Sequence, residues 1–252
     1  MNFVWASKVF RNSQVLEFLE EDKPCSYFDE KISDIRYKYM EQCSVDEQLN
    51  MLERGWRRFG NMHFVPECKD CNACKTIRID INKFKFSKNQ KRILSKNKDT
   101  QVYIQKPTVT YEHIDLFNKY HKKMETIKGW KENKIDVQEY HNSYVNGAHD
   151  FGKEILYFRD DKLIAVALCD MLTDGISAIY CYYDHDYEYL SLGKFSILAQ
   201  ISIAKQSNIP YLYLGYWIKD HSSMGYKENY KPFEILENRP TRKEKTIWSD
   251  YV

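Results

Sequence analysis

The sequence contains no long apolar run. No stretch of its 252 residues approaches the roughly 20 consecutive apolar residues that a membrane-spanning helix requires. The opening residues, MNFVWASKVFRNSQ, have neither the apolar centre nor the small-residue cleavage site of a secretory signal. We therefore expect a cytoplasmic protein with no membrane partner.

The composition is that of a folded protein. Hydrophobic residues make up 43% of the chain and include 20 tyrosines, so a sizeable core can form and disorder is excluded. A chain of more than about 200 residues more often holds two structural units than one. Nothing in the composition predicts an oligomeric state.

The spacing of the cysteines predicts a metal site. The stretch CKDCNACKTIR places Cys68, Cys71 and Cys74 at two-residue intervals, and a tight turn brings such thiolates toward one ion. Cys25, which follows a proline, is the preferred fourth ligand, and Cys43 is its rival. Four thiolates suit zinc or an iron–sulfur cluster, and a reduced loop without metal is the alternative. Disulfides are not expected, because seven cysteines is an odd number and the cytosol is reducing.

Acidic residues are absent from one basic segment. Between residues 83 and 98 the run KFKFSKNQKRILSKNK holds seven Lys or Arg, whereas the whole chain carries a net charge of only +2. A helix that begins after Ser87 as N-cap would bury Ile93 and Leu94 and turn the basic side chains outward. This pattern favours a phosphate-bearing partner over a merely solvated face. The residues that we expect to contact phosphates are Lys88, Lys91, Arg92, Lys96 and Lys98.

The first half of the chain predicts mixed elements. A short helix over 46–54 precedes a hairpin that turns at Gly60–Asn61, and isoleucines alternate along a strand over 76–81. A linker over 102–110 leads to a helix from residue 111, and a weaker helix covers 137–145. We place the boundary here, between an N-terminal domain over 1–105 and a C-terminal acyl-transfer domain over 106–252.

The second half predicts an antiparallel meander, then a helix and a returning strand. Three strand-like runs are joined by turns at Asp160–Asp161 and Asp174–Gly175. The stretch EYLSLGKFSILAQISIAKQSN then forms a turn and a helix, and IPYLYLGYW forms the last strand. This order is that of a GNAT-type acyltransferase, an α+β fold in which a helix N-terminus after the meander offers backbone N–H groups to the donor.

Two long regions resemble a known family. GWRRFGNMHFVPECKDCNACKTIRI and FKFSKNQKRILSKN are similar to the N-terminal region of the aminoacyl-tRNA–protein transferases of the N-degron pathway. YYDHDYEYLSLGKFSILAQI and YLYLGYWIKDHSSMGYKENYKPFEIL are similar to their C-terminal region. The likeness runs from about Cys25 to Leu236, and the compact length resembles the bacterial aspartate/glutamate leucyltransferases. His185, Phe195 and Lys88 depart from the family pattern.

The resemblance implies a reaction and a metal set. It implies transfer of an amino acid, leucine with arginine as the alternative, from aminoacyl-tRNA to the α-amine of proteins that begin with Asp or Glu. Such transfer marks the acceptor for degradation. The resemblance also implies two GNAT-like halves, and a cysteine set that in some relatives holds an iron–sulfur cluster and here matches Cys25, Cys68, Cys71 and Cys74. The transfer chemistry itself requires no cofactor.

The reaction needs orientation more than strong acid–base catalysis, because an aminoacyl ester is already activated. We expect backbone N–H groups near Ser191 and Gly193, with the strand over 213–216, to frame the ester. Asp184 orients or deprotonates the amine, or else it only forms a turn. Tyr226 is a further catalytic candidate.

The two substrates call for an apolar slot and a cation. Tyr213, Trp217 and Met224 are candidates for the slot that holds a leucyl side chain, with core packing as the alternative. A carboxylate on the acceptor is best bound by a guanidinium. The candidate cations, for which ordinary ion pairing is the alternative, are Arg57, Arg58, Arg78 and Lys227.

Two rival functions explain less of the sequence. An acyl-CoA-dependent N-acetyltransferase has a donor loop richer in glycine and led by Arg or Gln, whereas EYLSLGK has one glycine and neither leader. A non-enzymatic nucleic-acid-binding module would account for the cysteines and the basic run. It would leave the meander half without a role.

Overall fold

The chain folds around two β-sheets. The computed structural model describes residues 10–12 and 15–251, so most of the opening stretch that was searched for a secretory signal lies outside it. The smaller sheet has the strand order β1-β2-β3-β5-β4, and all its pairs are antiparallel. Its strands are β1 (Phe10–Asn12), β2 (Val15–Pro24), β3 (Ile32–Met40), β4 (Arg57–Phe59) and β5 (Met62–Pro66).

The larger sheet carries the predicted meander. Its order is β13-β12-β6-β11-β10-β9-β8-β7, in which β8, β9 and β10 pair antiparallel and β11 lies parallel to β10. These features confirm the α+β class and the GNAT-type arrangement of the C-terminal half. The strands are β6 (Lys75–Asp80), β7 (Gln101–Gln105), β8 (Gly152–Arg159), β9 (Lys162–Met171), β10 (Gly175–Tyr183), β11 (Tyr211–Trp217), β12 (Phe233–Leu236) and β13 (Trp248–Tyr251).

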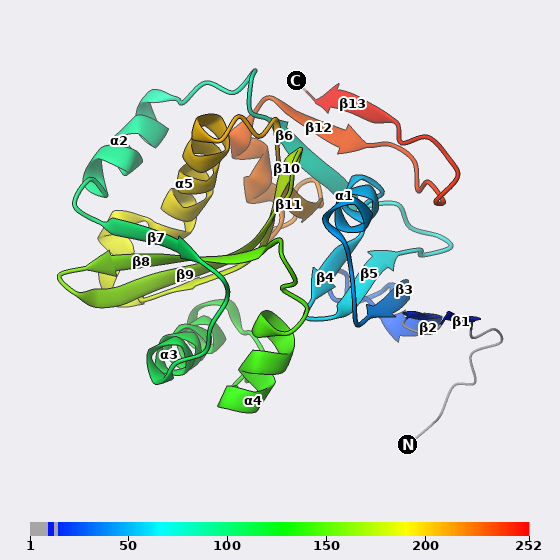
Figure 1. Ribbon diagram of the computed structural model, residues 1–252, viewed down its shortest axis with the longest axis horizontal. Helices are drawn as coiled ribbons and strands as arrows, with labels where there is room; N and C mark the ends of the chain where they lie inside the picture. The colour runs from blue at the N-terminus through cyan, green and yellow to red at the C-terminus, as the bar shows by residue number, and fades with distance from the viewer. Residues whose placement is uncertain (1–9, 13–14, 252) are drawn as a thin grey trace.

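Strands from both halves of the chain share the larger sheet. β6 lies between β11 and β12, and β7 forms the outer strand beside β8 (Figure 1). The sheets therefore do not divide at residue 105, and the proposed domain boundary stays a prediction. Both faces of β6 are covered, because Thr76 and Arg78 are buried as well as Ile77 and Ile79.

Helices cover both faces of the larger sheet (Figure 1). α5 (Leu192–Gln206) and α2 (Lys88–Lys96) pack on one face, and α3 (Tyr111–Lys128) packs on the other. α4 (Val137–Tyr140) continues as a π-helical turn, η1 (His141–Val145), at the position of the weaker predicted helix. α1 (Val45–Glu53) and the short helices η2 (His185–Leu190) and η3 (Gly225–Tyr230) complete the chain.

Local sequence signals explain where the helices begin. Ser87 caps α2, its hydroxyl accepts from the backbone N–H of Gln90, and the Gln90 side chain accepts in return from the N–H of Ser87. The predicted N-terminus of the basic helix is thus confirmed. Ser44 caps α1 by accepting from the backbone N–H of Glu47 at 3.1 Å.

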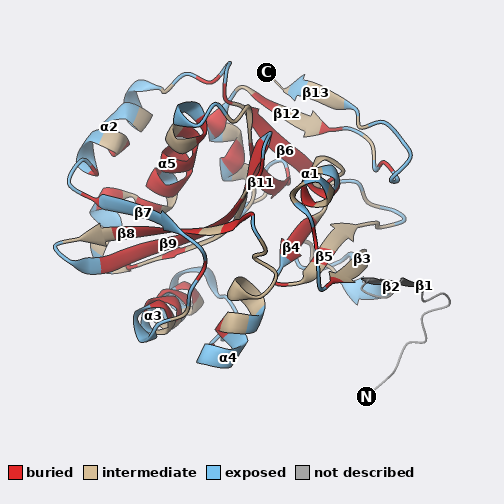
Figure 2. Cartoon of the chain, viewed as in Figure 1, coloured by how far each residue is buried: buried red, intermediate tan, exposed pale blue. Residues whose placement is uncertain are grey.

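The core lies on the two faces of the larger sheet (Figure 2). One cluster joins β6, β8–β11 and α5 and contains the predicted isoleucines Ile77, Ile79 and Ile81, exposed by 0%, 0% and 3%. A second cluster joins the sheet to α3. No helix in the described part of the chain is long and apolar enough to cross a membrane.

Candidate active site

The larger sheet opens into a fork. β10 and β11 pair only over Gly175–Ser177 and Tyr211–Tyr213, and beyond these residues the two parallel strands separate. β11 is also irregular against β6 between Tyr213 and Gly215. Gly215 has φ +78°, and a Cβ there would lie 3.2 Å from Nη2 of Arg57. The position thus requires glycine, both for its backbone conformation and for the close approach of a guanidinium.

Arg57 occupies this fork from β4. Its Nη2 donates to the carbonyl oxygen of Ala178 at 2.9 Å, a group of β10 just beyond the last residue that pairs with β11. The side chain is 8% exposed, and burial lowers the pKa of Arg57 from its ordinary value. Among the described residues, its buried Nη1 has no hydrogen-bond partner and no carboxylate pairs with the guanidinium.

Lys227 brings a second cation to the same region from η3. Its Nζ donates to the backbone carbonyl of Tyr216 and lies 3.7 Å from Sδ of Met224. Burial, and then the nearby charge of Arg57, lower the pKa of Lys227 to about 7. Within residues 15–251 no carboxylate pairs with Lys227 either, so two buried cations act on each other electrostatically without a counter-ion.

The other two predicted cations are neutralised inside the protein. Arg58 forms a two-pronged ion pair with the fully buried carboxylate of Asp170 on β9, which also accepts from Gln48 of α1 at 2.9 Å. Arg78 donates to Glu234 at 2.6 Å, and its guanidinium lies 3.8 Å and 4.1 Å from the ring centres of Tyr211 and Trp248. These geometries favour the alternative of structural ion pairing for both arginines.

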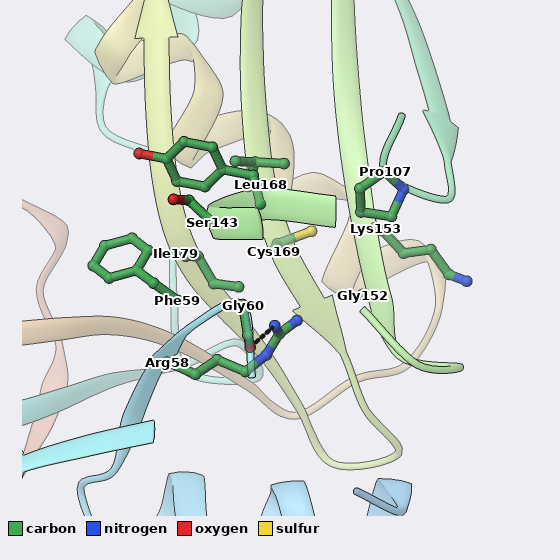
Figure 3. A pocket seen from close by; sticks show the side chains of 11 residues that line it. Arg58, Phe59, Gly60, Pro107, Ser143, Gly152, Lys153, Leu168, Cys169 and Ile179 are labelled. Carbon is green, nitrogen blue, oxygen red and sulfur yellow. Dashed lines mark hydrogen bonds between the residues drawn. The ribbon is translucent and has the colours of Figure 1, made fainter. Parts of the chain in front are cut away.

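A small hollow lies beside Arg58, but it is too small for a substrate. Figure 3 shows Arg58 at its base, donating to the carbonyl oxygen of Gly60 at 2.9 Å. The hollow has a volume of about 10 Å³, room for about one water molecule. It cannot receive a leucyl group.

Asp184 is held as a helix cap rather than left free to act as a base. It is 1% exposed and caps η2 by accepting from the backbone N–H of Asp186 at 3.0 Å. Lys119 and Lys162 lie 2.6 Å and 2.9 Å from its two oxygens. Burial acts to raise the pKa of Asp184, but the bonds from the two lysines outweigh it and lower the pKa overall. This arrangement favours the turn-forming alternative.

The predicted donor loop lies at the start of α5. Ser191 adopts the left-handed conformation with φ 56°, and its N–H donates to the carbonyl of Glu188 at 2.9 Å. Gly193 falls in the first helical turn, where N–H groups lack intrahelical acceptors. A Cβ on Gly193 would lie 3.2 Å from the ring of Tyr183, so glycine allows α5 to pack against the end of β10.

Only one of the three apolar-slot candidates borders the fork. Met224 is half-buried beside Lys227. Tyr213 is completely buried, and its hydroxyl lies 3.2 Å from Arg78 Nη1. Trp217 packs edge-on against the rings of Phe233 and Tyr251 in the core of the larger sheet. For Tyr213 and Trp217 the structure therefore favours core packing.

The basic helix lies beside the donor loop. All five predicted phosphate-binding side chains are exposed, and in the described part of the chain none of them forms an ion pair: Lys88, Lys91, Arg92, Lys96 and Lys98. At the C-terminal end of α2, Asn97 donates to the carbonyl of Leu190 in η2 at 2.9 Å. Near its N-terminus, Gln90 donates to the carbonyl of Asn229 in η3 at 3.2 Å. The helix thus bridges both short helices that flank α5.

Four cysteines gather at one end of the smaller sheet. The backbone carbonyl of Lys31 accepts from the backbone N–H of Cys25 at 2.9 Å, and Nζ of Lys31 lies 3.7 Å from Sγ of Cys71. Burial first, and then the charges of Cys25, Cys68 and Cys71, raise the pKa of the Cys74 thiol to about 12. Cys43 instead contacts Gln48 at 3.8 Å and lies outside this group. Arg239 ties the loop by donating to the carbonyls of Cys68 and Cys71 at 3.1 Å and 2.7 Å.

The four thiols are suitable metal ligands, but they are not arranged around a common point at which a metal ion could bind. Four sulfurs are the donor set that zinc or an iron–sulfur cluster accepts. Over the described residues, no group of three or more Cys, His, Asp or Glu is arranged so that it could hold a metal ion. All seven cysteines are free thiols.

Sequence reasoning missed the fork itself. It selected Arg57 as one of several equivalent cations and did not single out Ala178 or Gly215. One signal was present, since a glycine inside a strand pattern indicates a bulge or a close backbone approach. The partner of Arg57 is 121 residues away in the chain, so no local pattern marks it.

An antiparallel meander, then a helix, then a parallel strand that pairs with the meander only briefly is the arrangement of a GNAT-type acyltransferase. Comparison of sequences narrows this class. Residues 23–92 match the family model "Arginine-tRNA-protein transferase, N terminus", and residues 112–237 match the corresponding C-terminus model. The chain belongs to the arginine-tRNA–protein transferase family and is an aminoacyltransferase.

Similar proteins occur in several bacteria. An aspartate/glutamate leucyltransferase of Helicobacter hepaticus is 47% identical over 94% of this chain and 99% of its own length. One from Campylobacter jejuni is 45% identical over 87% of this chain and 92% of its own. One from Saccharophagus degradans is 38% identical over 88% and 93%. The likeness therefore spans both sheets and the cysteine loop.

Proposed function

We propose that this protein transfers leucine from leucyl-tRNA to the α-amine of proteins that begin with Asp or Glu, in the cytoplasm, and so marks them for degradation. Arginine is the alternative donor residue. The names of the relatives support leucine and the two acceptors. The geometry supports the acceptors independently, through the charges at the fork.

The observation that carries the proposal is the uncompensated pair of Arg57 and Lys227. Buried charges are costly unless they are paired, so two buried cations without a counter-ion form a site prepared for an anion. A carboxylate from the acceptor's first residue supplies that anion. The free Nη1 of Arg57 is a donor available to it, whereas Arg58 and Arg78 are already occupied by Asp170 and Glu234.

The remaining chemistry follows from the position in which the fork holds the acceptor. With its side chain bound at the fork, the acceptor holds its α-amine near the opening between β10 and β11. An N-terminal amine has a pKa of about 7.7–8.0, so much of it is neutral and nucleophilic at physiological pH. Its nitrogen attacks the ester carbonyl and a C–N bond forms. The C–O bond to the ribose breaks, and the proton that the nitrogen loses is balanced by the one that the ribose oxygen takes up.

The chain contributes electrostatic and steric help to this step. The N–H of Gly193 in the first turn of α5 stabilises the developing oxyanion, while Ser191 sets the direction of the helix. Met224 lines the slot for the leucyl side chain, and Tyr213 and Trp217 hold β11 in place from the core. Asp184 fixes the loop after β10, and Tyr226 contacts the donor.

The basic face of α2 binds the tRNA backbone in this proposal. Four exposed cations on α2 and Lys98, just beyond its end, form no ion pair with any described residue. They suit a row of phosphates and would release counter-ions on binding. The helix is fixed to η2 and η3, so a nucleic acid on this face arrives next to the start of α5.

The four-thiol cluster would hold zinc or an iron–sulfur cluster through Cys25, Cys68, Cys71 and Cys74. These ligands would let a bound metal cross-link the end of β2 to the loop before β6. A hydrogen bond of 3.0 Å between Nε2 of His221 and the backbone carbonyl of Tyr27 connects this region to the loop that precedes η3. A metal held there would stabilise the surroundings of Lys227.

The test is a transfer assay read by mass spectrometry. The enzyme is incubated with leucyl-tRNA or arginyl-tRNA and with peptides that begin with Asp, Glu, Asn or Lys. We expect leucine to be added to the Asp and Glu peptides alone. Transfer of arginine would replace the donor assignment, and transfer to Asn or Lys peptides at a similar rate would overturn the role of the fork.

A further inference from the structure

A second cavity lies between the basic helix and η3, separate from the hollow beside Arg58. Its volume is about 220 Å³, and its walls come from α2, from α5 and from η3. This is below the roughly 300–1,000 Å³ of pockets for drug-sized ligands. The cavity therefore suits a group of about nucleoside size rather than a long carrier chain.

The lining combines a flat aromatic surface with free polar groups. The ring of Tyr226 is 48% exposed, and Leu198 supplies an apolar wall. Asn89 is exposed and has no hydrogen-bond partner among residues 15–251, so its amide can both donate and accept. Bases stack on aromatic side chains, and an asparagine amide matches the edge of adenine.

The amide of Gln90 is already engaged by the backbone. Its oxygen accepts from the N–H of Ser87, and its nitrogen donates to the carbonyl of Asn229. Gln90 therefore fixes the width of the cavity by joining its two walls. This leaves Asn89 as the side chain on α2 that can read a base.

The position of the cavity connects the phosphate-binding face to the fork. Lys88 and Lys91 flank Asn89 on α2, and Lys194 lies on the opposite wall. Tyr226 and Lys227 are consecutive residues of η3: the first lines the cavity, and the second belongs to the cation pair at the fork. A nucleoside bound here would carry its ribose toward the site of transfer.

We infer that this cavity binds the 3′-terminal adenosine of the donor tRNA, with the base stacked on Tyr226 and its edge on Asn89. The inference rests on the proposed function, because it assumes an aminoacyl-tRNA donor. It adds a subsite that reads the last nucleoside, whereas the basic side chains of α2 contact only phosphates.

The experiment compares two uncharged RNA hairpins that end in CCA or in CC. Fluorescence anisotropy gives the dissociation constant of each for the full-length protein. Stacking of one base is expected to favour the CCA hairpin roughly 5- to 150-fold. We expect Tyr226→Leu and Asn89→Ala to remove or reduce this preference, and Tyr226→Phe to retain it. Tyr111→Leu, at an 82% exposed tyrosine on α3, is the matched control and should change nothing.

The outcomes separate this inference from the proposed function. Equal affinity of the wild-type protein for the two hairpins, or an unchanged preference in Tyr226→Leu, would overturn the subsite even if leucine transfer to Asp peptides is intact. A clear preference for CCA in a protein that transfers nothing to Asp or Glu peptides would support the subsite and reject the proposed function. If adenosine monophosphate alone binds as tightly as the CCA hairpin, the cavity is a free-nucleotide site and the inference is wrong.

Discussion

Nη2 of Arg57 donates to the carbonyl oxygen of Ala178 at 2.9 Å, at the point where β10 and β11 stop pairing. A strand carbonyl that would otherwise bond to the neighbouring strand is thus satisfied by a side chain from the smaller sheet. The same guanidinium keeps a second nitrogen without a partner among the described residues. One residue therefore both closes the fork and leaves it ready for an anion.

Replacing this guanidinium should weaken recognition of acidic acceptors. Arg57→Met removes a charge-assisted hydrogen bond, worth about 1.5–3 kcal/mol. We expect kcat/KM for an Asp peptide to fall roughly 10- to 150-fold. Lys219→Met, at an exposed position two residues past the end of β11, is the control and should keep wild-type values. An unchanged kcat/KM in Arg57→Met would remove Arg57 from the acceptor site.

Binding of the acceptor carboxylate should depend on pH through Lys227. Burial lowers the pKa of Lys227 to about 7, so its charge is present below this pH and lost above it. Arg57, which stays charged, and Cys74 are the other titratable groups that act on it. A peptide with an acetylated N-terminal Asp carries the carboxylate without a titrating amine.

The inhibition constant of this acetylated peptide is the measurement. It should increase as the pH rises from 6 to 9 in the wild-type protein. In Lys227→Arg it should stay nearly constant, because arginine remains charged over this range. The same pH dependence in both proteins would show that Lys227 is not the titrating group.

Asp184 should prove to be a stabilising residue. Its lowered pKa means that its contribution to stability is complete above the unfolded pKa of about 3.9 and is lost as the pH falls through the folded value. Asp184→Asn should lower the free energy of unfolding by about 1–3 kcal/mol at pH 7. The difference should shrink below about pH 4, as followed by urea unfolding at several pH values. Loss of the acidic limb of the rate profile in Asp184→Asn, at wild-type stability, would instead support a general base.

Single neutralisations on α2 should lower the salt dependence of tRNA binding. For Lys91→Ala the slope of log Kd against log salt should fall by roughly 0.7–0.9, the value for one phosphate contact. Lys83→Ala is the matched control from the same basic run, because Lys83 is already paired with Asp80 and Asp250. Equal effects of the two substitutions would argue against a specific phosphate-binding face.

Metal content should distinguish the two candidate fourth ligands. Cys25 is a neighbour of Cys74, whereas Cys43 lies against Gln48. We expect Cys25→Ser to lose most of the metal that the wild-type protein retains, and Cys43→Ser to retain it. Elemental analysis of protein purified without oxygen gives the stoichiometry. A wild-type protein without zinc or iron would reject the metal site.

Sequence alone determined the features that depend on neighbours in the chain. The N-cap at Ser87 follows from its reciprocal bonds with Gln90, three residues on. The meander follows from strand patterns and from turns at aspartates and a glycine, and its order was enough to predict the fold class. Such features can be read because the interactions that produce them span a few residues.

Tertiary structure decided which of the candidate residues are available. Arg57 and Arg58 are adjacent in sequence, but side chains alternate along a strand and point to opposite faces. One meets a carbonyl 121 residues away, and the other meets a carboxylate 112 residues away. Packing also separates Cys25, which acts on Cys74, from Cys43, which contacts Gln48. Whether a buried charge is already neutralised depends on contacts between distant segments, and these exist only once the sheets have formed.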